Sequence, residues 1–310
     1  SSSAASDVYK RQGIYRAAKT LNKKAYIVID NPTSSIIPLM NTFRDNQDYE
    51  ADMFVNNHEA KEIMDDNTLL VVVDTNKPSI TQCEDLLYMA KMIVVLDHHR
   101  QGSDTIRNSV LSYIEPYASS ASEMVAEILQ YFTEGIRIRN VEADSIYAGI
   151  MIDTDNFMQK TGVRTFEAAA FLRRCGADVT RVRKLFREDM NDYKARGETI
   201  RNAELFRGQF AISECPSDYV DSPTVVGAQA ANELLNIVGV KASFVLTEYK
   251  GVIYISARAI DEVNVQIIME RMGGGGHLNM AGCQLETVNM EGARNLLKST
   301  LTEMQDGGEI

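Results

Sequence analysis

The feature that most constrains this chain is a series of short, β-branched, nearly all-apolar runs that alternate with segments of helical pattern. The runs cover residues 25–29, 53–55, 69–73 and 92–96. Such runs are typical of strands buried on both faces of a parallel sheet. The intervening segments, residues 34–43, 58–64 and 80–89, have the length and pattern of crossover helices. The pattern predicts a doubly wound α/β domain with a parallel sheet.

The rest of the chain divides into a helical stretch and a smaller region of different pattern. Residues 120–206 favour helices. Beyond them, three strand-like alternations and two amphipathic segments predict a small α+β domain. A chain of 310 residues is long enough for two domains. We expect the first domain over residues 13–190, a linker helix over residues 191–207 and the second domain over residues 208–310.

Residues 1–12 differ from everything that follows. They are rich in Ser and Ala, then basic, and they show neither an apolar period nor a signal-peptide core. The helical pattern that begins at Gly13 has no capping residue before it. We therefore expect residues 1–12 to be a tag or a sequence artefact that lies outside the fold.

Composition limits the function classes. The chain has 43 Asp and Glu against 32 Lys and Arg, a net charge of −11, and no dense basic block. A dedicated duplex-DNA binder is excluded, because neutralising phosphates requires clustered cations. No stretch approaches the ~18 uninterrupted apolar residues of a membrane helix. The cysteines, which are far apart and form no CxxC pair for zinc, predict reduced thiols in a cytoplasmic protein: Cys83, Cys175, Cys215 and Cys283.

Metal-ligand residue types follow three apolar segments. Asp74 comes directly after the third run, His98 and His99 come just after the fourth, and Asp153 ends a later apolar segment. Open α/β sheets bind ligands beyond the carboxyl ends of their strands. An Asp in such a place is more often a turn or cap residue, but adjacent histidines gain little from packing there. Together the four residues favour a site for Mn²⁺ or Mg²⁺, two of which can activate water for phosphoester cleavage.

The motifs around these residues resemble a known family. VVDTN, VLDHH and GIMIDTDNF resemble, in order and spacing, the second, third and fourth motifs of the DHH phosphoesterases. GGGGH followed by NMAG resembles the signature of the partner domain, DHHA1. The likeness covers residue 13 to the end. Within the family, EPYASSASEMV and DTDNFMQKTGVRTFEAA are most similar to bacterial cyclic-di-AMP phosphodiesterases, some of which belong to membrane-anchored proteins.

The resemblance implies a role for each matching residue. Asp74 would bridge two divalent ions, with Mn²⁺ preferred, and His98 and Asp153 would ligate the second ion. His99 would contact the scissile phosphate, where an imidazolium stabilises developing charge. Asn76 and Asn156 would orient the ligands.

The resemblance also implies a nucleotide-binding wall in the second domain. Glycines allow backbone N–H groups to approach a phosphate closely, although such a run is more often a flexible turn. The residues implied in this wall are Arg258, Gly274, Gly275, Gly276, His277 and Asn279. Arg258 could equally be a surface cation on a strand. Arg164 could pair with a phosphate or be an exposed cation at a helix start, and the residues alone leave both open.

One family feature has no counterpart here. The family's first motif supplies a histidine and two aspartates ahead of the helix that begins near Gly13. This chain has histidines only at 58, 98, 99 and 277, and only Asp7 is acidic before residue 13. The first ion would lack most of its ligands. We therefore expect this 310-residue chain to be an impaired, N-terminally truncated enzyme whose parent is complete.

The resulting prediction is a Mn²⁺-dependent phosphodiesterase that hydrolyses cyclic-di-AMP to the linear dinucleotide pApA. Two alternatives stay open: a nanoRNA hydrolase or 3′-phosphoadenosine-phosphate phosphatase on the same scaffold, and a non-catalytic nucleotide-binding module. The expected partner is a cyclic dinucleotide or a short oligoribonucleotide. The oligomeric state is left open, with a homodimer among the options. A parent protein could be tethered to the cell membrane by upstream segments.

Polar residues at two predicted helix starts have structural interpretations. The serines of residues 119–122 are expected to cap the following helix, with Ser122 as N-cap or Glu123 in its first turn. His58 follows a turn at a helix start, where a structural role is expected.

Overall fold

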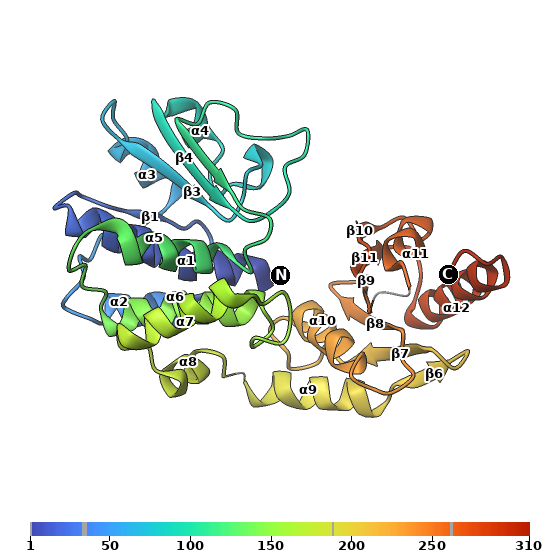
Figure 1. Cartoon of the computed structure of the whole chain (residues 1–310). Helices are drawn as coiled ribbons and strands as arrows, with labels where there is room; N and C mark the ends of the chain where they lie inside the picture. Colours follow the sequence, from blue (N-terminus) through green and yellow to red (C-terminus); the bar gives the residue numbers. More distant parts are fainter. Residues whose placement is uncertain (1, 33–35, 188, 261–262) are drawn as a thin grey trace. The chain divides into compact units, whose positions relative to one another are not determined.

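The computed structural model describes residues 2–32, 36–187, 189–260 and 263–310. The chain forms two compact units, Ser1–Arg187 and Glu188–Ile310, each with its own hydrophobic core (Figure 1). None of the helices within the described residues combines the length and the apolar character needed to cross a membrane.

The strands of the first unit form two small parallel sheets. A two-stranded sheet pairs β1 with β2, and a three-stranded sheet has the order β3-β4-β5. The bounds are β1 Ile27–Val28, β2 Phe54–Val55, β3 Leu69–Val73, β4 Met92–Asp97 and β5 Leu111–Ile114. The α/β class and the parallel direction are confirmed, although the expected single sheet is divided in two and β5 was not predicted.

The central strand, β4, is more deeply buried than its neighbour β3. Ile93 and Val95 of β4 are buried against Leu87 of α4 (Asp85–Met89). β3, by contrast, pairs only with β4 inside its sheet, and its first residue, Leu69, is 51% exposed. The expectation that these runs are buried on both faces is therefore wrong for β3, because a strand at the edge of a sheet is only partly covered.

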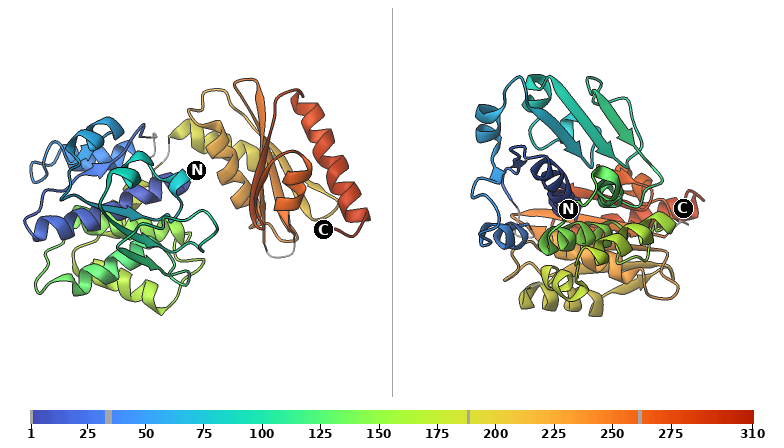
Figure 2. Two further views of the ribbon diagram at one scale, coloured as in Figure 1. Left: turned by 90° about the horizontal axis from the view of Figure 1, so that it is seen from above. Right: turned by 60° about the vertical axis from the view of Figure 1, so that its left-hand side comes forward.

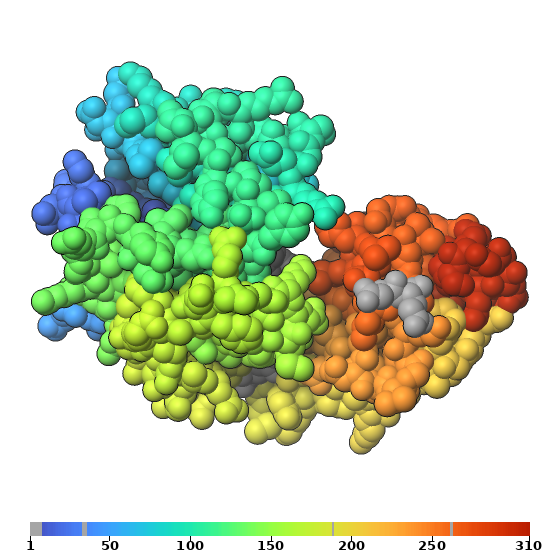
Figure 3. All heavy atoms as spheres, in the orientation of Figure 1, coloured from blue at the N-terminus to red at the C-terminus, as the bar shows by residue number. Residues whose placement is uncertain are grey.

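A layer of helices packs beneath these sheets (Figure 1). The central helix, α6, buries side chains all around its circumference, because α1, α5 and α7 surround it. The space-filling view shows the green and yellow-green outer surface of this helical layer (Figure 3). Besides α4, the helices of the unit are α1 Ser2–Thr20, α2 Ile37–Arg44, α3 Asn57–Ile63, α5 Ala121–Phe132, α6 Asn140–Asp153, α7 Val163–Arg174 and α8 Val179–Leu185, with a 3₁₀ turn at Pro78–Ile80.

Helix α1 corrects one expectation from the sequence. The predicted boundary at Gly13 is wrong, because the helix begins at Ser2 and runs through that residue. Val8 and Tyr9 are 1% and 2% exposed and belong to the main core of the unit, and Lys10 is fully buried. Residues 8–12 are therefore part of the packed structure. Gly13 allows the close packing, because a Cβ there would lie 2.3 Å from Cγ1 of Val125.

The second unit is a six-stranded sheet covered on both faces. The strand order is β10-β11-β9-β8-β7-β6, and only β7 and β8 run parallel. Phe210 and Phe244 pack in one core with α11 and α12, whereas Ala211 and Val245 pack in another with α10, as the two-residue period of a strand requires. Figure 2 shows helices on both sides of this sheet. The bounds are β6 Glu204–Phe206, β7 Phe210–Cys215, α10 Pro223–Leu234, β8 Ala242–Tyr249, β9 Val252–Ala259, α11 Val265–Arg271, β10 Gly275–His277, β11 Met280–Leu285 and α12 Met290–Asp306.

The stretch expected to be a linker, residues 191–207, is integrated into the second unit. Helix α9 (Met190–Arg201) buries Ala195 in the core beside α10, and Thr199 is fully buried. The Thr199 carbonyl accepts a hydrogen bond of 2.6 Å from Ser213 Oγ on β7. Strand β6 then joins the sheet. The rest of α9 is mostly polar, and its contact with the second unit is made by the narrow face that carries Ala195 and Thr199.

Candidate metal centre

Asp74 stands where β3 ends beside β4. The two strands pair with Val73 opposite Leu96, so their carboxyl ends lie side by side. The Asp74 N–H donates to the Leu96 carbonyl at 2.8 Å, and its φ of 72° turns the chain sharply out of the strand. Its side chain is only 5% exposed. A left-handed non-glycine residue of this kind is costly and is often found at functional sites.

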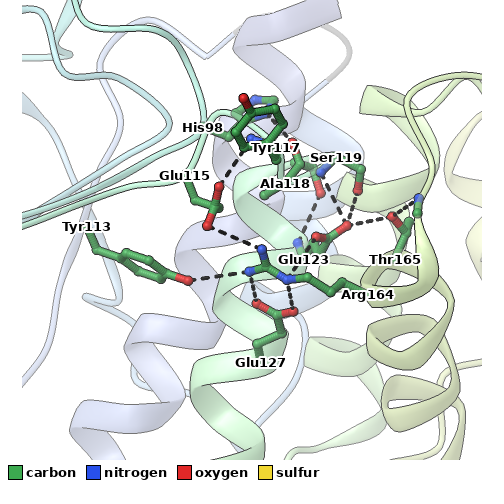
Figure 4. Close-up of polar contacts among 12 residues, drawn as sticks. His98, Tyr113, Glu115, Tyr117, Ala118, Ser119, Glu123, Glu127, Arg164 and Thr165 are labelled. Atoms are coloured by element: carbon green, nitrogen blue, oxygen red, sulfur yellow. Dashed lines mark hydrogen bonds and ion pairs between the residues drawn. The ribbon is translucent and has the colours of Figure 1, made fainter.

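His98 follows β4 and points back toward Asp74. Its Nδ1 lies 3.2 Å from the Ala118 carbonyl oxygen, an atom that can only accept, so Nδ1 carries the proton (Figure 4). Its Nε2 lies 3.3 Å from Asp74 Oδ1. The lone pair of Nε2 therefore faces the carboxylate, and a metal ion could use both. Metal-binding histidines commonly donate their other ring N–H to a carbonyl in this way.

His99 is held by a neighbour that the sequence analysis did not single out. Its Nδ1 lies 2.7 Å from Oδ1 of Asp97, a fully buried carboxylate. The other oxygen of Asp97 accepts a hydrogen bond of 2.5 Å from Asn76 Nδ2. The bond to Asp97 raises the pKa of His99 above its usual value, against the opposing effect of burial. The position of Asp97 directly before two histidines was the available signal.

Asp153 is the last residue of α6, and it reaches Asp74 through a cation. The Nζ atom of Lys10 forms an ion pair with Asp74 Oδ2 and lies 3.0 Å from Asp153 Oδ2. Beyond Asp153, Asp155, Asn156 and Phe157 all adopt positive φ, at 46°, 56° and 67°. Asn156 is exposed in this turn, and its predicted orienting role stays a prediction.

Three of these residues bring possible metal-ligand atoms close together. Within the described part of the chain, the potential ligand atoms of Asp74, His98 and His99 lie within 4.8 Å of one another. Carboxylate and imidazole donors suit Mn²⁺ or Mg²⁺. The chemistry of the cluster therefore fits a divalent ion, which Asp74 and His98 would hold. Asp153, the third predicted ligand, is not part of this group of three and contacts the Lys10 ammonium instead.

Arg164 is engaged by acidic side chains (Figure 4). Its Nε and Nη2 donate to the two oxygens of Glu127, both at 2.7 Å. Its Nη1 lies 3.4 Å from Glu115, and Nη2 lies 3.4 Å from the Tyr113 hydroxyl. The bond to Glu127 raises the pKa of Arg164 further above its already high value. The structure uses this residue to tie α7 to α5 and β5, and its contact with a phosphate stays a prediction.

A serine caps α5 and Glu123 lies in its first turn, as expected, but the capping serine is a different one. Ser120, not Ser122, is the N-cap, and its Oγ accepts the Glu123 N–H at 3.0 Å. The Glu123 carboxylate is 1% exposed and accepts hydrogen bonds from the hydroxyls of Ser119 and Thr165, the latter at 2.6 Å. Glu123 therefore links the first turn of α5 to α7. His58 lies on the exposed surface, 3.7 Å from Glu62.

In the second unit, the glycine run forms a strand rather than an open loop. Gly275–His277 is β10, which pairs antiparallel with β11. A Cβ on Gly274 would lie 2.1 Å from the Gly282 carbonyl oxygen, and one on Gly276, whose φ is 149°, would lie 2.5 Å from Ala281 Cα. These two glycines are required for the fold itself. A Cβ on Gly275 would meet nothing within 4 Å, so within the strand Gly275 leaves the backbone open to a ligand.

The other predicted nucleotide-binding residues lie near this strand. Arg258 of β9 pairs in register with Met280 of β11. Its Nη1 donates to the Ala257 carbonyl at 2.9 Å, and its Nε is buried without a hydrogen-bond partner in the described structure. Burial lowers the pKa of Arg258 below its usual value. His277 and Asn279 are exposed in the hairpin, and their roles stay predictions.

Two family models match the chain. The DHH family, N-terminal domain, matches residues 13–150, and the DHHA1 domain matches residues 210–303. The chain belongs to the DHH family. The two matches fall in the first and second units respectively, which agrees with the order of the motifs along the sequence.

Curated proteins are similar to this chain over most of its length. The chain is 41% identical over 302 residues to the cyclic-di-AMP phosphodiesterase GdpP of Bacillus subtilis, and 38% identical over 292 residues to PdeA of Listeria monocytogenes. These alignments cover 96% and 93% of this chain, but only 45% and 44% of the two relatives. A bifunctional oligoribonuclease and PAP phosphatase, NrnA of Thermus thermophilus, is 24% identical over 306 residues, covering 96% of this chain and 86% of NrnA. The chain thus spans less than half the length of the cyclic-di-AMP phosphodiesterases that it matches.

Solved structures confirm the fold. An exopolyphosphatase-related protein from Bacteroides fragilis aligns with a TM-score of 0.80 over 97% of this chain and 89% of that protein, at 20% identity. The exonuclease RecJ bound to manganese aligns with a TM-score of 0.53 over 95% of this chain and 87% of RecJ, at 12% identity.

The acidic contacts of Arg164 lead to a test of its role. Arg164→Met should lower the free energy of unfolding by about 0.5–1.5 kcal/mol, because a bidentate pair is lost at a partly exposed and screened position. Arg174→Met is the control, since Arg174 is exposed on the same helix and makes no hydrogen bond or ion pair with the described residues. Urea unfolding measures both. Unchanged stability of Arg164→Met with a loss of nucleotide affinity would instead assign Arg164 to the phosphate.

Proposed function

We propose that this chain carries the catalytic machinery of a phosphodiesterase that hydrolyses cyclic-di-AMP to pApA with two divalent metal ions, preferably Mn²⁺. The observation that carries the proposal is the convergence of Asp74, His98 and His99 at the carboxyl ends of β3 and β4. The 38–41% identity to proteins named cyclic-di-AMP phosphodiesterases supports the choice of substrate.

The residues of the first unit divide into ligands and a phosphate contact. Asp74, His98 and Asp153 hold metal, and a bound divalent ion supplies Lewis acidity and a water of lowered pKa. His99 donates a hydrogen bond to a nonbridging oxygen of the scissile phosphate. Because Asp97 raises the pKa of His99, the imidazolium form that stabilises negative charge persists to higher pH.

The second unit supplies nucleotide-binding groups. Arg258 is partly buried, and within the described residues its guanidinium donates to a carbonyl while its Nε has no hydrogen-bond partner, so it is suited to an anion such as a phosphate. The open face of Gly275 allows a ligand to approach the strand backbone closely. His277 and Asn279 add exposed polar groups in the same hairpin. Together these features favour a dinucleotide held by its phosphates and its bases.

A second candidate activity is the hydrolysis of short oligoribonucleotides or of 3′-phosphoadenosine-phosphate. The two NrnA relatives at 24% and 23% identity are the observation that favours it. The metal ligands would serve either substrate, because both reactions place water on a phosphorus atom beside divalent ions. A nucleotide-binding module without turnover is the third reading, since residues 1–12 contain no histidine and only Asp7 as an acid.

Hydrolysis distinguishes these activities. The 310-residue chain should convert cyclic-di-AMP to pApA at a barely detectable rate in Mn²⁺, because residues 1–12 do not provide the histidine and two aspartates that the family resemblance implies for the first ion. Replacing residues 1–12 by the residues of B. subtilis GdpP that lie ahead of the position equivalent to Gly13 should restore turnover. Asp74→Asn in that chimaera should reduce the rate at least ~100-fold, since each 1.36 kcal/mol of lost transition-state stabilisation is about tenfold. Chromatography of the nucleotides measures each rate.

Three results would contradict parts of this proposal. A chimaera that cleaves short oligoribonucleotides but not cyclic-di-AMP would establish the second candidate activity. A chimaera that binds nucleotide in Mn²⁺ without any turnover would establish a binding module. Rapid cleavage by the unmodified chain would show that the ligands ahead of residue 13 are not needed.

The glycine strand provides a separate test of nucleotide binding. Gly275→Val should fold normally, because its side chain enters open space, but should weaken cyclic-di-AMP binding roughly 10- to 100-fold by blocking a backbone hydrogen bond to a charged group. Gly197→Ala on α9, whose Cβ also meets nothing within 4 Å, is the control and should bind normally. Calorimetry measures both affinities. Unchanged affinity in Gly275→Val would exclude the strand from the binding site.

A further inference from the structure

The most unusual group in the first unit is the ammonium of Lys10. The side chain is 0% exposed, and its Nζ atom contacts carboxylate oxygens of both Asp74 and Asp153. These carboxylates come from different elements, one after β3 and the other at the end of α6. An ammonium is rarely buried unless it is paired. Here a positive charge from the chain lies between two of the residues proposed as metal ligands.

The charge balance explains why the ammonium is there. Two carboxylates that share a buried site repel each other, and each favours a cation nearby. Both a divalent ion and a protonated amine can supply that charge. Because Lys10 uses one oxygen of each carboxylate, a metal ion that uses the same oxygens must displace it.

The helix that carries Lys10 is fixed, so only its side chain is free to move aside. Nε and Nη2 of Arg16, one and a half turns further along α1, bond the carboxylate of Glu142 on α6 at 2.6–3.0 Å. The Tyr49 hydroxyl bonds the same carboxylate at 3.0 Å. The Arg11 guanidinium donates to the Val28 carbonyl at 2.7 Å. These contacts hold the backbone of α1 in place. The ammonium would therefore leave the carboxylates by rotation about the bonds of the four-carbon Lys10 side chain.

We propose that Lys10 is a tethered cation that neutralises the Asp74–Asp153 pair and competes with a divalent metal ion for it. The inference rests on the proposed role of these two carboxylates as metal ligands. Metal binding then requires the ammonium to leave the pair. Lys10 therefore sets the concentration of Mn²⁺ at which the site fills.

The test compares two neutralised lysines on the same helix. Lys10→Met keeps a long flexible side chain but removes its charge, and Lys19→Met removes an equal charge from a partly exposed pair with Glu50. Calorimetry with Mn²⁺ as the only ligand should show about 10- to 100-fold tighter binding in Lys10→Met, the range over which groups beside metal ligands change affinity. Lys19→Met should match the unmodified chain. Asp74→Asn should abolish the binding in each background.

The possible outcomes separate this inference from the proposed metal site. Equal Mn²⁺ affinity in Lys10→Met and the unmodified chain, still dependent on Asp74, would overturn the role of Lys10 alone. Absence of Asp74-dependent Mn²⁺ binding in every variant would overturn the metal site itself. Thermal unfolding adds a second readout, because Mn²⁺ should raise the Tm of Lys10→Met more than that of the unmodified chain.

A measurement on the unmodified chain applies if the neutral variant does not fold. With ¹⁵N-labelled lysine, the Nζ resonance of Lys10 should shift toward the position of an exposed lysine when diamagnetic Mg²⁺ is added. Lys19 supplies the reference resonance on the same helix. A Lys10 resonance that is unchanged at saturating Mg²⁺ would overturn the proposal.

Discussion

The parallel pairing of β3 with β4 is the constraint on which the site depends. With Val73 opposite Leu96, the chain leaves β3 at Asp74 just where β4 leads into His98. Side chains alternate between the two faces of a strand, so a slip of one residue would carry the histidine away from the carboxylate. The buried positions of β4 fix the register, because Ile93 and Val95 fill the core beneath α4. Packing far from the chemistry thereby sets the geometry of the metal ligands.

Charge compensation is the second requirement of this region. Three carboxylates lie within it, and two of them share one cation. Lys10 contacts Asp74 and Asp153, while Asp97 accepts from His99. An unpaired buried carboxylate would raise its own pKa or unfold its surroundings. The same pairs that stabilise the fold therefore decide how much negative charge is left for a metal ion.

The sequence predicted the strands and helices that have a local residue pattern. It did not predict the contacts between residues that are far apart in the chain. The apolar runs ending at Asp74 and near His98 identified the strand ends, because burial and chemistry were adjacent in the sequence. The role of Lys10 was not predictable, since it comes from a segment whose composition suggested no fold. The pairing of Arg164 with Glu127 joins residues 37 positions apart, which no local pattern encodes.

The most direct test of the metal centre is a crystal structure of the chain at saturating Mn²⁺, with manganese located by anomalous scattering. We expect a manganese peak with Asp74 oxygen and His98 Nε2 at about 2.0–2.3 Å, and with the Lys10 ammonium moved out of the Asp74–Asp153 pair. Manganese bound by other residues would contradict this expectation. So would a structure in which Lys10 still lies between the two carboxylates and no manganese is bound to His98.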